Sequence, residues 1–200
     1  MVILFSDKHF AVCVKPVGMD SEHEVPAALS HILGGDIFPI HRLDKNVGGV
    51  MVYARTKVAA AALSKAVQDG TLVKEYIAMV HGLPPEAGDW TDLLFKDSSK
   101  NKVFVVKKER KGVKKARLEF MRLTSTEPTT VRIRLHTGRS HQIRVQFASR
   151  GFPLLGDHKY GARDDFAAPR LFSCRLSFPY GGKQHCYSAL PDWAASETYL

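Results

Sequence analysis

Short apolar runs separated by polar turns recur along the chain and predict a protein built mainly from β-strands. Runs rich in β-branched and aromatic residues favour strands, above all where apolar and polar positions alternate. Such runs occur at residues 2–5, 10–14, 50–54, 71–81, 103–106, 116–123 and 131–136. The first two flank a polar turn and predict a hairpin. The hairpin leads into a loop at Lys15-Pro16, because proline removes a backbone donor.

Two segments carry helix signals at their ends. Residues 24–32 form a short helix candidate that ends at Gly34-Gly35. Thr56 is placed to cap a helix over residues 57–69, and Gly70 is placed to end it. We expect an apolar face made of Val58, Ala61, Ala62, Leu63, Ala66 and Val67.

Residues 141–150 fit either a strand or a helix. The apolar side chains at 143, 145 and 147 alternate as in a strand, whereas Ile143 and Phe147 also have helical spacing. Ser140 as a cap and Gly151 as a stop favour the helix. Arg144 then falls in its first turns. The loop that follows, residues 151–162, is of the kind that lines a cleft.

The stretch from His41 to Ala54 places a carboxylate on a loop that is fixed at both ends. An apolar segment precedes it, Gly48-Gly49 turns the chain, and a buried strand follows. Arg42, two residues before Asp44, can keep that carboxylate ionised where water is excluded. An ionised aspartate can act as a base or as a nucleophile. The same spacing also fits an ordinary turn ion pair, so the motif alone leaves both interpretations open.

The charge balance favours a polyanionic partner. The chain has 29 Lys and Arg against 20 Asp and Glu, a net charge of +9, and nucleic acid is the first candidate partner. A basic enzyme whose lysines only maintain solubility is the alternative.

Residues 107–115 are the densest basic run and predict a hairpin tip that grips phosphates, or else a solvated loop. Its cations are Lys107, Lys108, Arg110, Lys111, Lys114 and Lys115.

Length and composition predict one domain over residues 1–200 in a cytoplasmic protein. A hydrophobic content of 44% in 200 residues suffices for one core, and no Pro, Gly or Ser run divides the chain. We find neither a bilayer-spanning apolar run nor a signal peptide. Cys13, Cys174 and Cys186 show no metal-ligand or disulfide spacing and are interpreted as core or incidental thiols.

Three separated motifs resemble the RluA-type pseudouridine synthases. They are HRLD before a glycine turn and strand, KEY about thirty residues later, and LHTGRSHQIRVQFASRGFPLLGDHKYGA; KPVGM, PRLF and LSFP add to the likeness. The resemblance implies an α+β fold, with a mixed, mainly antiparallel central sheet flanked by helices and a central cleft. It also implies isomerisation of a uridine in structured ribosomal or transfer RNA. The family usually has Thr-Ser-Gly where this chain has Val47-Gly48-Gly49, so hydroxyls that could support the aspartate loop are missing.

The resemblance also assigns residues. It makes Asp44 the catalytic aspartate, Arg42 the arginine beside it, Tyr76 the aromatic under the target base and Arg144 the partner of the Asp44 carboxylate. Further RNA contacts are expected from the basic run and from His41, Arg132, Arg134, Arg139 and His141. The isomerisation involves no net oxidation or hydrolysis, so we expect no cofactor and no metal. Because the first strand begins at the N-terminus, we expect a catalytic domain alone, acting as a monomer.

Several alternatives remain open at this point. Asp44 can attack C6 of the base, attack C1′ of the sugar or only abstract a proton, and the sequence does not distinguish these. A non-catalytic RNA-binding protein is one rival, and a hydrolase with Asp44 as nucleophile and His41 or His141 as base is another. No spacing demands the hydrolase, so structural hydrogen bonding is favoured over catalysis for both histidines.

Overall fold

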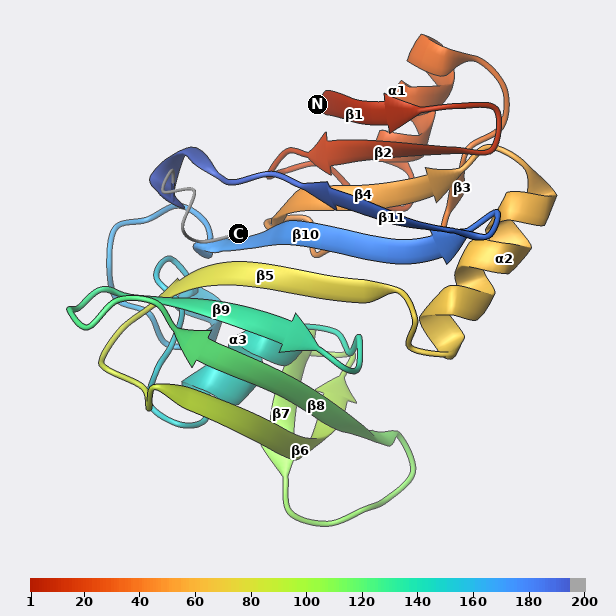
Figure 1. Ribbon diagram of the computed structural model, residues 1–200. Coiled ribbons are helices and arrows are strands. Elements are labelled where there is room, and N and C mark those ends of the chain that lie inside the picture. Colours follow the sequence, from red (N-terminus) through yellow and green to blue (C-terminus); the bar gives the residue numbers. More distant parts are fainter. Residues whose placement is uncertain (195–200) are drawn as a thin grey trace. The chain divides into compact units, whose positions relative to one another are not determined.

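The structure, a computed structural model, describes residues 1–194 and divides into two compact units (Figure 1). Among the described residues, unit 1 comprises residues 1–75 and 172–194, and unit 2 comprises residues 76–171. The chain passes from unit 1 to unit 2 within strand β5 (Val73–Val80) and returns at the start of strand β10 (Leu171–Tyr180). The single domain over residues 1–200 stays a prediction.

Unit 1 is built on a sheet in which β1, β2, β4 and β10 are neighbours in that order, while β3 pairs with β4 and β11 with β10. The pairs are antiparallel except β4 with β10, which run parallel. The remaining bounds are β1 Val2–Ser6, β2 Phe10–Lys15, α1 Glu24–Leu33, β3 Phe38–Pro39, β4 Gly48–Ala54, α2 Lys57–Gln68, β11 Lys183–Ser188 and a 3-10 turn, Asp192–Ala194.

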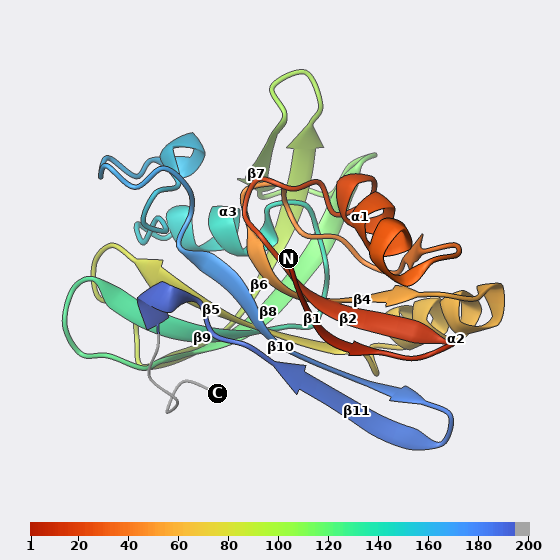
Figure 2. The same cartoon turned by 90° about the horizontal axis from the view of Figure 1, so that it is seen from above.

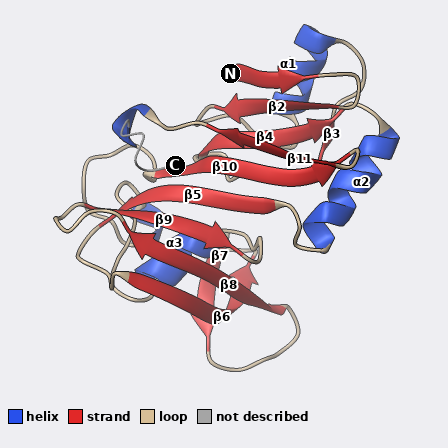
Figure 3. Cartoon of the chain, viewed as in Figure 1, coloured by secondary structure: helices blue, strands red, loops and turns tan. Residues whose placement is uncertain are grey.

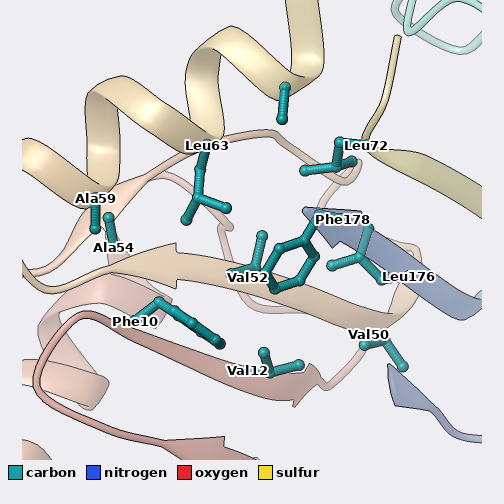
Figure 4. Close-up of a cluster of buried hydrophobic side chains, with 11 residues drawn as sticks. Phe10, Val12, Val50, Val52, Ala54, Ala59, Leu63, Leu72, Leu176 and Phe178 are labelled. Atoms are coloured by element: carbon teal, nitrogen blue, oxygen red, sulfur yellow. The ribbon is translucent and has the colours of Figure 1, made fainter. Parts of the chain in front are cut away.

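Helix α2 packs on this sheet through a narrower face than the one predicted. As expected, the Thr56 hydroxyl caps it by accepting from the Ala59 N–H at 3.1 Å. Val58, Ala61 and Ala62 face solvent instead of the core, because the buried stripe follows the spacing of Ala59, Leu63 and Ala66. Figure 4 shows this stripe facing side chains of β2, β4 and β10. The cluster contains Phe10, Val12, Val50, Val52, Ala54, Ala59, Leu63, Ala66, Leu72, Leu176 and Phe178.

Unit 2 is a sheet with the strand order β5-β9-β8-β6-β7 and contains one α-helix, α3 (Figure 3). The helix lies against β6 and β7. Together the two units have a mixed, mainly antiparallel strand pattern with helices, so the predicted α+β fold class is confirmed; the central cleft stays a prediction. The further bounds are β6 Ala87–Asp97, β7 Lys102–Val106, β8 Val113–Arg122, β9 Thr129–Leu135, α3 Gln142–Ala148 and a 3-10 turn, His158–Tyr160.

The basic run is not the tip of a hairpin, contrary to the prediction. Strands β7 and β8 do not pair with each other, because each pairs with β6, which lies between them and has no counterpart among the predicted strands. Val106 is opposite Leu93 of β6, whereas Val113 is opposite Phe95. Residues 107–112 therefore cross β6.

The double glycine does not turn the chain either. Gly48 and Gly49 lie inside β4, and the turn is one step earlier, where the Val47 N–H donates to the Asp44 carbonyl at 2.9 Å. A Cβ atom on Gly49 would overlap the backbone of Ser173 on β10, and its φ of 133° also favours glycine. Close approach of β4 and β10 explains this glycine, and Asp44 becomes the first residue of the turn.

Candidate functional site

The turn that carries Asp44 is tied to the loop after β2 by a buried lysine. The side chain of Lys15 is inaccessible to solvent. Its ammonium donates to the carbonyl oxygens of Pro16 at 2.9 Å, Met19 at 2.8 Å and Lys45 at 3.2 Å. Three acceptors match the three donors of an ammonium group, which is how a protein compensates for burying this charge. Because Lys45 follows Asp44 directly, one side chain fixes both loops.

Ser21 fixes the same turn from the other side. Its hydroxyl donates to the Leu43 carbonyl at 2.9 Å and accepts from the Leu43 N–H at 3.2 Å. The Tyr53 hydroxyl donates to the Ser21 carbonyl at 2.9 Å and so connects this arrangement to β4. The residues on both sides of Asp44 are therefore held, while Asp44 itself is half-buried.

Electrostatics link the buried lysine to nearby carboxylates. Burial lowers the pKa of Lys15 from its ordinary 10.5 to about 8, while the carboxylates of Asp20 and Asp44 act in the opposite direction. Lys15 remains mostly protonated at neutral pH. Sequence reasoning missed this residue as part of the site, although a lysine at the end of a buried strand, directly before a proline, was a visible signal.

His41 lies before the turn as a neutral ring. Its Nε2 accepts from the Val52 N–H at 3.4 Å, and its Nδ1 is buried without a hydrogen-bond partner among the described residues. Burial and, to a smaller extent, the charge of Lys74 lower the pKa of His41 from its ordinary 6.5 to about 3. His41 therefore carries no positive charge near pH 7. Its assignment to RNA binding stays a prediction.

The neighbouring Arg42 is more exposed and forms an ion pair with Glu22, while its predicted pairing with Asp44 stays a prediction. Its guanidinium lies 2.9 Å from the Glu22 carboxylate, and more than two fifths of each side chain is accessible to solvent. An exposed ion pair of this kind contributes little to stability. It leaves the arginine on the surface of the loop.

In unit 2, a buried ion pair orients Arg144 from the first turn of α3. Nε of Arg144 lies 2.7 Å and Nη2 lies 2.8 Å from the two carboxylate oxygens of Asp157. Both residues are buried, and this bidentate geometry is the strongest arrangement for such a pair. The guanidinium carbon also lies 5.2 Å from the centre of the Tyr160 ring. The predicted pairing of Arg144 with Asp44 stays a prediction.

The start of α3 differs from the expected Ser140 cap. His141 occupies the cap position in a left-handed conformation, with φ of 52°, and its side chain does not cap the helix. The side chain of Gln142 holds the preceding turn instead. Its Oε1 accepts from the Thr137 hydroxyl at 2.8 Å and from the Arg139 N–H at 3.1 Å. His141 Nδ1 lies 2.8 Å from the Tyr160 hydroxyl.

Asp164 organises the loop that contains Asp157. Its carboxylate accepts from the backbone N–H groups of Gly156 at 2.9 Å and Phe166 at 3.0 Å, and it lies 2.6 Å from His81 Nε2. Burial alone would raise the pKa of Asp164, but these hydrogen bonds lower it below its usual value. Since Gly156 directly precedes Asp157, Asp164 helps to position the partner of Arg144. Sequence reasoning found none of His81, Asp157 and Asp164.

The other predicted residues are distributed as follows. Tyr76 is buried in β5, Arg132 is half-buried and Arg134 exposed on β9. Arg139 is exposed and donates from Nε to the Lys115 carbonyl at 3.0 Å. The six predicted cations of the basic run are all exposed.

Two further properties concern the described chain as a whole. Across residues 1–194, no group of three or more His, Cys, Asp or Glu side chains is arranged to hold a metal ion. No helix in this part of the chain combines the length and apolar character that a membrane crossing needs. The three cysteines are free thiols, two of them buried.

Comparison with known proteins defines the class and then the family. The fold is that of the pseudouridine synthases: the structure titled "Human RNA Pseudouridylate Synthase Domain Containing 4" aligns with a TM-score of 0.80 at 24% identity, over 96% of this chain and 89% of that one. The RNA pseudouridylate synthase family model matches residues 9–149. The chain belongs to this family, which confirms the resemblance seen in the sequence.

Two curated relatives give the extent of the match. The "Dual-specificity RNA pseudouridine synthase RluA" of Escherichia coli is 32% identical over 96% of this chain and 94% of that protein. An "Uncharacterized RNA pseudouridine synthase" of Aquifex aeolicus is 35% identical over 89% of this chain. The match spans only 63% of the length of the Aquifex protein.

We predict that Lys15→Met destabilises the protein by about 2 kcal/mol, because the buried carbonyls of Pro16 and Met19 lose a hydrogen-bond donor. Urea unfolding at pH 7 measures the loss. Lys65→Met is the control, since its side chain is 74% exposed and pairs only with Asp69. This control should leave the free energy of unfolding unchanged. Equal stability of the Lys15 variant and the parent would contradict the anchoring role.

We predict an acid-sensitive contribution from His41. Because its folded-state pKa is about 3 instead of 6.5, the unfolded chain binds the proton more tightly. The contribution of His41 to the free energy of unfolding is therefore fully present above pH 6.5 and is lost as the pH drops towards 3. The loss between pH 7 and pH 5 is about 2 kcal/mol.

His41→Gln should remove this part of the pH dependence, since an amide does not titrate. The measurement is the difference between parent and variant in the free energy of unfolding, at pH 7 and at pH 5. His31→Gln, at an exposed position at the end of α1, is the matched control and should keep the parent slope. The same slope in parent and His41 variant would refute the assignment.

Proposed function

We propose that this chain is an RNA pseudouridine synthase in which Asp44 is the catalytic carboxylate. Family membership over residues 9–149 is the observation that carries the proposal. The geometry supports it, since Lys15 and Ser21 hold the turn from both sides while Asp44 stays only half-buried. A carboxylate in a fixed position that retains solvent access suits attack on a substrate or proton abstraction from it.

The reaction balances without a co-reactant. The N1–C1′ bond of uridine breaks, the uracil rotates, and a C5–C1′ bond forms; C5 loses a proton and N1 gains one. The product is an isomer of the substrate, so nothing is oxidised or hydrolysed. The reacting atoms are inaccessible inside a helix, so the uridine must first leave its stack. Addition of Asp44 to C6, its addition to C1′ and proton abstraction all use the same carboxylate.

Other residues take supporting parts in this proposal. Tyr76 stacks under the extruded uracil, a contact worth roughly 1–3 kcal/mol. Arg144, oriented by Asp157, pairs with the Asp44 carboxylate and keeps it ionised. Arg42 occupies the place that the base vacates or binds a flanking phosphate. The RNA backbone is contacted by His41, Arg132, Arg134, Arg139, His141, Lys107, Lys108, Arg110, Lys111, Lys114 and Lys115.

The proposed substrate is ribosomal or transfer RNA. The Escherichia coli relative, which the chain matches over nearly its full length, is named a dual-specificity enzyme. The net charge of +9 is consistent with a polyanionic substrate.

We predict that Asp44→Asn abolishes pseudouridine formation but leaves RNA binding within about twofold, since the amide keeps the shape and loses the charge. Tritium release from RNA labelled at uridine C5 measures turnover, and filter binding measures affinity. Asp36→Asn, at an exposed position in unit 1, is the matched control and should retain full activity. Turnover by the Asp44 variant would refute the catalytic assignment.

We also predict that cells lacking the gene lose pseudouridine at one or more specific ribosomal or transfer RNA positions. Comparing pseudouridine maps of total RNA from these cells and from complemented cells identifies the target. Complementation with the Asp44→Asn gene should fail to restore the modification. Identical maps with and without the gene would contradict the proposed substrate class.

A further inference from the structure

The positive charge of the protein is concentrated in one short segment of unit 2. Residues 96–115, which we call the basic segment, contain nine Lys and Arg against two acidic residues. They supply +7 of the net +9 of the whole chain. The basic segment comprises the end of β6, β7, the loop at 107–112 and the start of β8. Figure 2 shows the turn between β6 and β7 extending beyond the sheet of unit 2.

Two phenylalanines lie side by side on the outer face of this segment. Phe95 of β6 is directly opposite Phe104 of β7, so both rings are on the same side of the sheet. Their neighbours Leu94 and Val103 point to the opposite side and join a buried cluster with Val145 of α3. Phe104 remains 37% exposed. The strand thus places an aromatic ring in solvent among cations.

The two rings differ in how they are covered. The Arg110 guanidinium lies 4.4 Å from the centre of the Phe95 ring, and the backbone at Gly112 also lies against this ring. Phe95 therefore anchors the basic loop. The Lys102 ammonium lies 5.8 Å from the centre of the Phe104 ring. Cross-strand pairing accounts for Phe95 but leaves the outer surface of Phe104 without a structural role.

Phe104 is the outer end of a row of side chains that leads to Arg144. The ammonium of Lys102 lies 5.3 Å from the centre of the Tyr160 ring as well as near Phe104. The Tyr160 hydroxyl accepts from the Val103 N–H at 2.9 Å, which fixes the ring against β7. The Arg144 guanidinium and the His141 ring also lie next to the Tyr160 ring. Lys102 thus contacts the rings of both Phe104 and Tyr160, and Tyr160 in turn contacts the buried Arg144 guanidinium.

We propose that Phe104 and Lys102 form a subsite for an unpaired nucleotide of the substrate RNA. The base stacks on the exposed surface of Phe104, and the phosphate is bound by Lys102 and by the cations of the loop. Every base has a face that can stack on an aromatic ring, whereas paired and stacked bases do not expose one. The subsite therefore selects RNA with a single-stranded segment. This inference rests on the proposed function.

A second exposed phenylalanine shows what distinguishes this subsite. Phe166 is 39% exposed and also has a guanidinium over its ring, that of Arg170 at 4.4 Å. Its surroundings are different, since residues 163–170 contain two arginines and two aspartates and have no net charge. Phe166 has the same ring and exposure but lacks a phosphate-binding surface. It is the matched control.

The test is binding of a single-stranded 12-nucleotide oligouridylate that contains one 2-aminopurine, compared with the same sequence in a perfect RNA duplex. The full chain is used in the Asp44→Asn background so that no turnover occurs. Stacking on Phe104 should quench the 2-aminopurine fluorescence. Phe104→Leu should weaken binding of the single strand about tenfold and remove the quenching. Phe104→Trp should retain both, and Phe166→Leu should change the Kd less than about twofold.

Lys102→Gln gives a second measurement that does not depend on the ring. The slope of log K against log salt for the single strand should fall by about 0.7, the value for one lost phosphate contact. Thermal unfolding of each variant checks that it is folded.

Two results would overturn the subsite: parent-like binding by folded Phe104→Leu, or equal weakening by the Phe104 and Phe166 variants. Duplex binding tighter than single-strand binding would also overturn it in favour of backbone contacts alone. If the protein with Asp44 intact forms no pseudouridine while Phe104→Leu still weakens binding, the catalytic proposal is refuted and the binding subsite remains. If the protein forms pseudouridine normally but Phe104→Leu does not weaken binding, the subsite is refuted and the catalytic proposal stands.

Discussion

The geometry of the Asp44 turn depends on the burial of one positive charge. An ammonium group without solvent contact is costly unless carbonyl or carboxylate oxygens surround it, and Lys15 satisfies this need with three backbone carbonyls. Those carbonyls belong to two loops that are about thirty residues apart in sequence. The penalty for exposing or unpairing the ammonium therefore becomes a restraint on both loops. Asp44 is therefore held in place by its neighbours in the turn and does not need to be buried itself.

Unit 2 uses the same principle at Arg144. The guanidinium is buried, and its cost is offset by the bidentate pair with Asp157. Asp157 is in turn placed by a loop that Asp164 closes through backbone N–H groups. A change at Asp164 thus acts on Arg144 through the loop rather than by direct contact. Both proposed catalytic side chains depend on supporting residues that are distant in sequence.

Local signals predicted most of the fold and longer-range compensation explains the failures. The Thr56 cap was identified correctly because capping involves residues only three apart. Strand β6 was missed because carboxylates such as Asp89 and Asp92 break its pattern. Arg117 and Arg150 neutralise them in the folded chain. Without β6, the basic run could only be interpreted as a hairpin tip.

The candidate site was predictable to the same extent and for the same reason. Asp44, Tyr76 and Arg144 were identified from motifs that resemble a known family, and motifs are local. Lys15 and Asp157 lie within motifs of the same kind, but their positioning roles, like that of Asp164, depend on contacts made only on folding. The family motifs therefore indicate the proposed reacting groups but do not show which other residues position them.

Buried and exposed positive charges have different roles in this chain. Lys15 and Arg144 are buried, bind protein oxygens and determine geometry, so bulk salt has little effect on them. The cations of the loop at 107–112 are exposed. One of them, Arg110, lies over the ring of Phe95 on β6. Exposed cations of this kind contribute affinity that decreases with salt. It follows that raising the salt concentration should weaken RNA binding well before it disturbs the turn that holds Asp44, so affinity and active-site geometry are set by different residues.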